Sequence, residues 1–142
     1  MEYKNIVVAL DGSEASEKAF QKSVDIAKRN NARLILAHVV DSRTFATAEA
    51  YDRTLAERSE TYAKQLLADY SEKAKNAGIT EVLQSIEYGS PKVKIAKDIA
   101  KDFHSDLIIC GATGMNAMER FLIGSVSESI TRYATCDVLV VR

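Results

Sequence analysis

The chain lacks the features that mark several protein classes. Its only two cysteines, Cys110 and Cys136, have neither CxxC spacing nor nearby histidines, so a zinc site is not expected. A formal net charge of −1 over 142 residues gives no broad attraction for nucleic acid or an anionic membrane. Its longest apolar runs hold about five residues, against the ~20 that cross a bilayer. Residues 1–5 contain no apolar signal region. We therefore expect a cytoplasmic protein with reduced thiols that binds neither nucleic acid nor membrane.

Two familiar phosphate-binding motifs are also missing. No GxxxxGK[ST] sequence occurs, and no lysine lies between Gly111 and Gly124, which excludes a Walker A loop. The GxGxxG dinucleotide fingerprint is absent. Its three glycines follow the first strand of a fold, whereas Gly111, Gly114 and Gly124 are spaced differently and come late in this chain. No Ser-His-Asp arrangement or carboxylate pair stands out near these glycines, so we predict little or no catalysis.

The chain does have a regular alternation of short apolar runs and amphipathic segments. The apolar runs predict buried strands over residues 5–10, 34–40, 81–88, 106–110 and 138–141. The segments between them predict helices over residues 13–30, 47–77, 90–103 and 124–135. Ser90 and Pro91 provide an N-cap and a first helical residue, and Gly78 a C-terminal stop. The long second helix is predicted from apolar residues that recur every three to four positions: Ala48, Tyr51, Leu55, Tyr62, Leu66, Tyr70 and Ala74.

Strands that alternate with helices imply right-handed crossovers and a mostly parallel sheet with helices on both faces. We predict a single domain over residues 1–142 with a doubly wound, Rossmann-like α/β fold and strand order 3-2-1-4-5. In such sheets ligands bind outside the carboxyl ends of the strands, where the strand order reverses. The predicted crevice therefore lies between strands one and four, which are followed by Asp11-Gly12-Ser13 and by Gly111–Gly114.

Three of the six glycines fall between the fourth strand and the last helix: Gly111, Gly114 and Gly124. Glycine lets a backbone approach a ligand closely, and the amides and dipole of a helix N-terminus favour phosphate. This segment predicts an anion site of the nucleotide-binding kind. Glycines in strand-to-helix loops are also ordinary turn residues, and Ser125 and Glu128 have the spacing of a capping box. A purely structural role therefore stays open.

These segments resemble the universal stress protein family. The pattern Gly111-x2-Gly114-x9-Gly124-Ser125 is similar to the ATP-binding signature of that family, and none of its glycines is missing. The likeness covers the whole chain and includes residues 6–13, 38–40, 89–91 and 137–141. The chain is thus identified as a universal stress protein domain of the ATP-binding branch.

The resemblance implies roles for matching positions in binding ATP. Asp11 would contact the adenosine, and Val39 with Val40 beside it would read the adenine edge through backbone groups. The ribose and phosphates would be held by the signature residues Gly111, Thr113, Gly114, Gly124, Ser125, Val126 and Ser127. ADP, AMP and cyclic nucleotides offer the same chemical groups, and Mg²⁺ or Mn²⁺ with the nucleotide would offset its charge.

Some residues near the predicted site have plainer explanations. Asp11 can be a turn or capping residue, and His38, inside an apolar run, is expected to be packed and hydrogen-bonded. Cys110 is expected to act as a small buried apolar residue. Arg120 can either reach the phosphates or stay solvated, and the apolar residues 121–123 are expected to pack against the core or a partner subunit.

The resemblance implies a nucleotide-dependent regulator in the stress response. A slow ATPase or nucleotide phosphohydrolase, and a nucleotide-independent dimerisation module, are the alternative interpretations. An apolar strand at a sheet edge needs cover, and antiparallel twofold pairing of two Val138–Val141 strands would provide it. Family members that resemble this chain form such homodimers, so we expect one here. Residues 41–60 can serve as a lid or as a partner surface.

Overall fold

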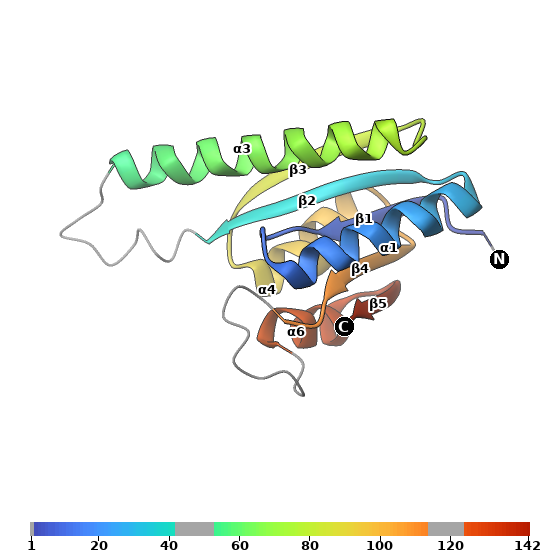
Figure 1. Ribbon diagram of the computed structural model, residues 1–142. Helices are drawn as coiled ribbons and strands as arrows, with labels where there is room; N and C mark the ends of the chain where they lie inside the picture. Colours follow the sequence, from blue (N-terminus) through green and yellow to red (C-terminus); the bar gives the residue numbers. More distant parts are fainter. Residues whose placement is uncertain (1, 42–52, 114–123) are drawn as a thin grey trace.

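The computed structural model describes residues 2–41, 53–113 and 124–142 (Figure 1). Its strands are β1 (Asn5–Ala9), β2 (Arg33–Asp41), β3 (Val82–Gly89), β4 (Leu107–Gly111) and β5 (Asp137–Val141). Three helices are α1 (Glu14–Asn30), α3 (Arg53–Asn76) and α6 (Ser125–Tyr133). A further helix, here called the composite helix, consists of α4 (Pro91–Val93), the π-helical turn η1 (Lys94–Ile99) and α5 (Ala100–Asp102).

The strands form one parallel sheet in the order β3-β2-β1-β4-β5, which confirms the predicted topology. The central strand β1 pairs on one side with β2, where Val7 lies opposite Ile35, and on the other side with β4, where Val7 lies opposite Ile108. The strand order reverses between β1 and β4. This switch point is where the doubly wound fold places its ligands.

Continuous apolar runs form the central strands because both faces of the sheet are covered. Ile6 and Val8 belong to one core cluster, whereas Val7, between them, belongs to the other. All three side chains are fully buried. Burial of each such side chain stabilises the fold by about 1.5–3 kcal/mol.

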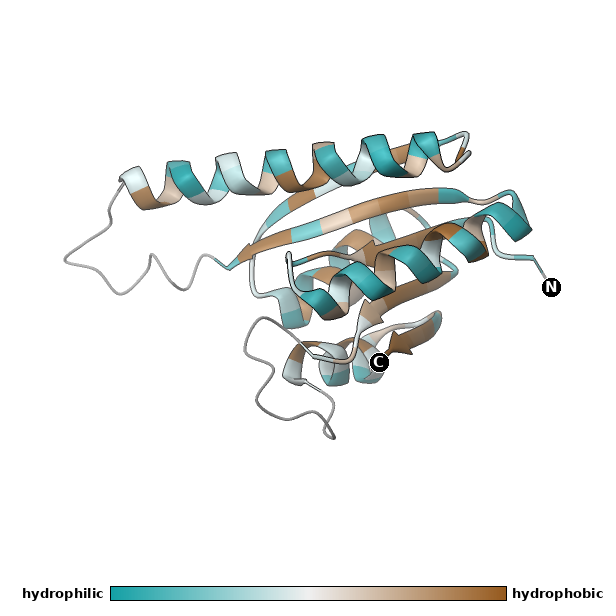
Figure 2. Ribbon diagram, viewed as in Figure 1, coloured by the Kyte–Doolittle hydropathy of each residue, from teal (hydrophilic) through white to brown (hydrophobic). Residues whose placement is uncertain are grey.

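Helices α1 and α3 cover one face of the sheet, and the composite helix and α6 cover the other (Figure 1). Phe20 of α1 and Leu67 of α3 are buried in the first cluster, and Ile99 and Ile130 are buried in the second. Figure 2 shows apolar colour along the strands and polar colour on the outer turns of α1 and α3. This is the layered arrangement that the alternating sequence pattern predicts.

The apolar pattern of α3 predicts its core contacts only in part. Tyr70 and Ala74 are buried, but Leu55 is 42% exposed and Tyr62 is 47% exposed. For Leu55, in the first turn of α3, the reason is visible in Figure 1, where the start of this helix extends beyond the carboxyl end of β2. Ala48 and Tyr51, predicted on the same stripe, lie outside the described residues.

The predicted helix over residues 90–103 forms, but with a wider turn inside it. Ser90 takes the N-cap position without a side-chain hydrogen bond, and Pro91 is the first helical residue as predicted. In η1 the amide of Ala100 donates to the carbonyl of Ile95, five residues earlier. Such π-turns occur often beside functional sites, and Ile95 does face the cavity described below.

Within the described ranges, no helix is both long and apolar enough to span a membrane.

Candidate functional site

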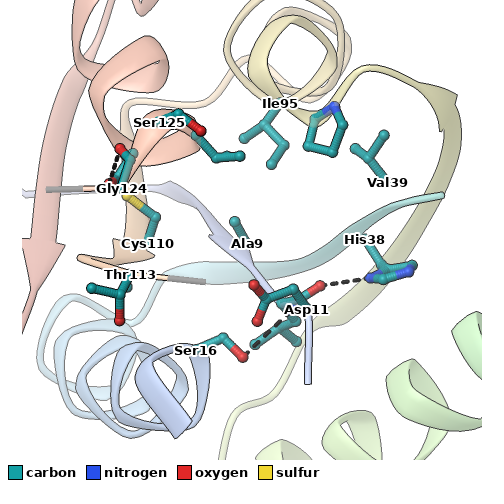
Figure 3. A pocket seen from close by; sticks show the side chains of 15 residues that line it. Ala9, Asp11, Ser16, His38, Val39, Ile95, Cys110, Thr113, Gly124 and Ser125 are labelled. Carbon is teal, nitrogen blue, oxygen red and sulfur yellow. Dashed lines mark hydrogen bonds between the residues drawn. The ribbon is translucent and has the colours of Figure 1, made fainter. Parts of the chain in front are cut away.

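A cavity of about 350 Å³ opens at the carboxyl end of the sheet, at the switch point between β1 and β4 (Figure 3). Its size falls in the range of small-molecule sites. The ends of β1, β2 and β4, the start of α1, the composite helix and the N-terminus of α6 supply its walls. The residues that line it are Ala9, Leu10, Asp11, Ser16, His38, Val39, Pro91, Ile95, Cys110, Gly111, Thr113, Gly124, Ser125, Val126 and Ser127.

The turn between β1 and α1 holds Asp11 at the cavity wall. The Ser13 amide donates to Asp11 Oδ1 at 2.9 Å, and the Asp11 amide donates to Ser16 Oγ at 3.4 Å. Ser13 caps α1, since its Oγ accepts from the Ser16 amide at 3.1 Å. Asp11 is therefore a turn residue, as one interpretation predicted. Figure 3 shows its carboxylate directed toward the side of the cavity where Thr113 lies, so it also faces the site.

His38 supports the same turn from β2. Its Nδ1 lies 2.7 Å from the carbonyl oxygen of Leu10, and because a carbonyl only accepts, Nδ1 carries the proton. The side chain is buried, which confirms a packed and hydrogen-bonded histidine. It also lines the cavity, a position that its apolar sequence context does not reveal.

Glycine is required at position 111 because the backbone there lies very close to the backbone of Ala15. A Cβ at this position would lie 2.8 Å from the backbone carbon of Ala15 in α1, too close for any side chain. The end of β4 therefore packs directly against the first turn of α1. Gly111 has a structural role in addition to its place in the cavity wall.

Gly124 differs from Gly111, because its backbone is extended, with φ −65° and ψ 160°. Any residue adopts these angles, so the turn itself does not demand glycine. Gly124 is the N-cap of α6, and Ser125 is the first helical residue. The predicted capping box of Ser125 with Glu128 is thus wrong: the helix begins one residue earlier than a Ser125 cap requires, and the Glu128 carboxylate instead pairs with Arg132 at 3.0 Å.

The N-terminus of α6 is anchored through Ala112. The Gly124 amide donates to the Ala112 carbonyl at 2.6 Å, and Ser127 Oγ lies 3.1 Å from the same oxygen. The Ala112 amide donates to Val141 of β5. The first amides of α6, those of Ser125 to Ser127, have no carbonyl of their own helix to bond. They lie at the cavity wall, where a helix N-terminus carries partial positive charge.

The electrostatics of the cavity come from few charged groups. Among the lining residues that the structure describes, Asp11 has the only charged side chain. Burial raises the pKa of the Cys110 thiol to about 12, so this side chain is a neutral wall rather than a nucleophile. Over the described ranges, no group of three or more His, Cys, Asp or Glu side chains is placed to hold a metal.

Eight of the ten predicted site residues meet at this cavity: Asp11, Val39, Gly111, Thr113, Gly124, Ser125, Val126 and Ser127. Val40 instead lines an adjoining hollow of about 290 Å³ together with Tyr62 and Arg58 of α3. Gly114, Arg120 and residues 121–123 lie outside the described residues. Sequence reasoning missed Ser16, Pro91 and Ile95, which carry ordinary helix signals and are brought to the site only by the fold.

Comparisons with known proteins agree with this geometry. The model of the universal stress protein family matches residues 2–142. A protein of Staphylococcus haemolyticus that bears the universal stress protein name is 51% identical over 140 residues, which cover 99% of this chain and 85% of that relative. Universal stress protein UspA from Lactobacillus plantarum superposes with a TM-score of 0.89 at 34% identity, over 100% of this chain and 99% of that chain. A universal stress protein in complex with cAMP superposes with a TM-score of 0.77 at 25% identity, over 100% and 99% of the two chains. The chain belongs to the universal stress protein family.

Proposed function

We propose that this protein is an ATP-binding member of the family and acts as a nucleotide-dependent regulator in the stress response. One observation carries the proposal: the switch-point cavity joins a carboxylate on one wall to the N-terminus of α6 on the other. Its volume of about 350 Å³ suits a nucleotide better than a bare anion. The cAMP complex of a universal stress protein at 25% identity supports the adenine nucleotide class.

The proposed roles follow the chemistry of each wall. Asp11 accepts hydrogen bonds from the adenosine hydroxyls, and the backbone at Val39 and Val40 reads the adenine edge. Gly111, Thr113 and Gly114 contact the ribose and phosphates. The α6 end, at Gly124, Ser125, Val126 and Ser127, solvates the phosphates with its amides and with the Ser125 hydroxyl. The uncharged donors present fit phosphate oxygens, so no lysine is needed.

A divalent cation fits this scheme as part of the nucleotide. Asp11, the one charged side chain among the described lining residues, is an oxygen donor of the type that Mg²⁺ and Mn²⁺ prefer. When bound, such an ion would offset the negative charge of the triphosphate. AMP and ADP need less of this compensation, and they are the other ligands that we propose.

The groups at the cavity favour regulation by nucleotide binding over catalysis. His38 Nδ1 is engaged with the Leu10 carbonyl, and the Cys110 thiol stays protonated at neutral pH. A slow hydrolysis of bound ATP would be revealed by ADP release in excess of that from a variant that does not bind. A cytoplasmic location stays a prediction from the sequence.

We test the phosphate site with a matched pair of variants at Ser125. This residue is exposed and is the first residue of α6. In Ser125→Asp the new carboxylate favours the helix dipole, so the fold is kept, but it repels phosphate. Ser125→Asn has nearly the same size without the charge. By isothermal titration we expect Mg·ATP to bind Ser125→Asp at least tenfold more weakly than Ser125→Asn, with adenosine unaffected.

Two other results would count against the proposal. Equal ATP affinity in both variants would show that the phosphates do not bind at the N-terminus of α6. No binding of any adenine nucleotide by the wild type would leave the nucleotide-independent dimerisation module as the working hypothesis.

We further propose a homodimer through β5. This strand is at the edge of the sheet and pairs with β4 on one side. Its residues Val138 to Val141 are apolar and half-buried. Antiparallel pairing of two copies across a twofold axis would cover both edges. A single species of monomer mass in light scattering at micromolar concentration would contradict it.

A further inference from the structure

Two aromatic side chains, Tyr62 and His38, hold the β1–α1 turn that carries Asp11, and only His38 also lines the cavity. Tyr62 of α3 donates its hydroxyl to the carbonyl oxygen of Asp11 at 3.4 Å. His38 of β2 donates Nδ1–H to the carbonyl oxygen of Leu10 at 2.7 Å. The two rings meet edge to face with centroids 6.0 Å apart. Consecutive carbonyls of the turn are thus bound by neighbouring side chains from two different elements.

The turn and the Tyr62 side chain also pack closely against each other at Gly12. Gly12 has φ +83°, a conformation that side chains rarely adopt. A Cβ at Gly12 would lie 2.0 Å from the Tyr62 hydroxyl oxygen and 3.3 Å from its Cζ. The hydroxyl therefore occupies the space that a Cβ at position 12 would need, in addition to the backbone conformation that favours glycine there.

Core packing does not explain this position of Tyr62. The side chain is 47% exposed, whereas the buried residues of α3 lie further along the helix, at Ala63, Leu67 and Tyr70. Tyr62 lines the hollow beside the carboxyl end of β2, together with Val39 and Val40. An exposed tyrosine whose hydroxyl bonds the turn beside Asp11 indicates a role at the site rather than in the core.

We propose that Tyr62, supported by His38, is a positioning residue that keeps the Asp11–Gly12 turn in its nucleotide-binding conformation. This inference rests on the proposed function and goes beyond it, because it makes α3 part of the binding machinery. The Asp11 carboxylate is oriented by the turn through the Ser13 amide. A turn held in place before the ligand arrives spares the cost of ordering it on binding. A partner or a modification that moves the start of α3 would thereby change nucleotide affinity.

The first test is a double-mutant cycle in the ligand-free protein. Gly12→Ala is expected to lower the melting temperature by several degrees in the wild type. In the Tyr62→Phe background, Gly12→Ala should lower the melting temperature by at least a third less, because the nearest remaining ring atom then lies 3.3 Å from the new methyl group. Equal costs in both backgrounds would overturn the fit between Tyr62 and the turn.

The second test is the affinity for Mg·ATP by titration calorimetry. We expect about threefold weaker binding for Tyr62→Phe, the loss of one modest hydrogen bond, and about tenfold for Tyr62→Ala. Melting temperatures without ligand should change by less than two or three degrees, since surface substitutions cost little. The matched control is Tyr133, which is 43% exposed at the far end of α6 from the cavity. Tyr133→Phe and Tyr133→Ala should bind within twofold of the wild type.

The outcomes separate this inference from the proposed function. If the wild type binds and the Tyr62 variants bind equally well, the positioning role is overturned and the nucleotide site stands. If Tyr62 and Tyr133 variants weaken binding alike, the effect is not local to the turn, and the positioning role is again overturned. If the wild type binds no adenine nucleotide, both proposals fail together.

Discussion

The two ends of the sheet use their polar residues in different ways. At the amino end, Asp106 accepts hydrogen bonds from the amides of Lys4 and Asn5 at 2.8 and 3.1 Å. Arg33 donates to the Asn5 side chain at 3.0 Å, and the Tyr3 hydroxyl donates to Asp137 at 2.7 Å. These polar groups satisfy one another and tie the strand starts together.

At the carboxyl end, polar groups face a cavity. Asp11 uses Oδ1 within its own turn, but its carboxylate also lies at the cavity wall. The first amides of α6 lie at the opposite wall. The polar residues at the amino end of the sheet therefore stabilise the fold, whereas we propose that those at the carboxyl end bind a ligand.

The largest loss of stability is expected for Gly111→Val. The added side chain would collide with the Ala15 backbone, from which a Cβ would be only 2.8 Å away. We expect a cost of about 3 kcal/mol, or a melting temperature lower by about 10 °C. Gly124→Ala is the control, because the Gly124 angles suit any residue. A Gly111→Val melt equal to that of Gly124→Ala would contradict the close packing of β4 on α1.

Asp106→Ala should be the next most damaging, with no effect on ligand binding. It leaves two backbone amides without their charged acceptor, at a cost of about 2 kcal/mol. Asp106→Asn keeps one acceptor oxygen and should lose about half as much. Chemical denaturation would measure both values. A variant that melts normally but binds nucleotide poorly would reverse the roles assigned to the two ends.

The smallest effect is expected at Cys110 and appears only at high pH. Burial raises the pKa of the folded thiol to about 12, above the ordinary value of about 8.5. Folding therefore favours the protonated thiol, and its contribution is full below pH ~8.5 and is lost as pH rises toward 12. The free energy of unfolding should fall over that range, and less so in Cys110→Ala. Identical pH profiles for the two proteins would show that the thiol is not desolvated.

Much of the fold could be predicted because its signals are local. Unbroken apolar runs such as Ile6–Leu10 require a strand covered on both faces, and their alternation with helices leads to the observed strand order. Asp11 and Ser125 could be found because they follow strands that end at the switch point.

The remainder depends on tertiary geometry that the sequence pattern does not encode. Tyr62 matches the apolar stripe of α3 but is half-exposed, and its hydroxyl reaches the turn of Asp11 instead. His38 lies in an apolar run, yet the alternation of β2 directs it toward α3 and the Leu10 carbonyl. The start of α6 moved by one residue because Gly124, in an extended conformation, took the cap position from Ser125.

The division between the two ends is tested most directly by thermal melts with and without saturating Mg·ATP. Three proteins are compared: the wild type, Asp11→Ala and Asp106→Ala. Ligand at about 100 times its dissociation constant stabilises by roughly 2.7 kcal/mol, a shift of about 5–10 °C at this chain length. We predict that Asp106→Ala melts lower than the wild type but keeps the full shift, whereas Asp11→Ala loses most of it. Equal shifts in Asp11→Ala and Asp106→Ala, or no shift in the wild type, would contradict the account.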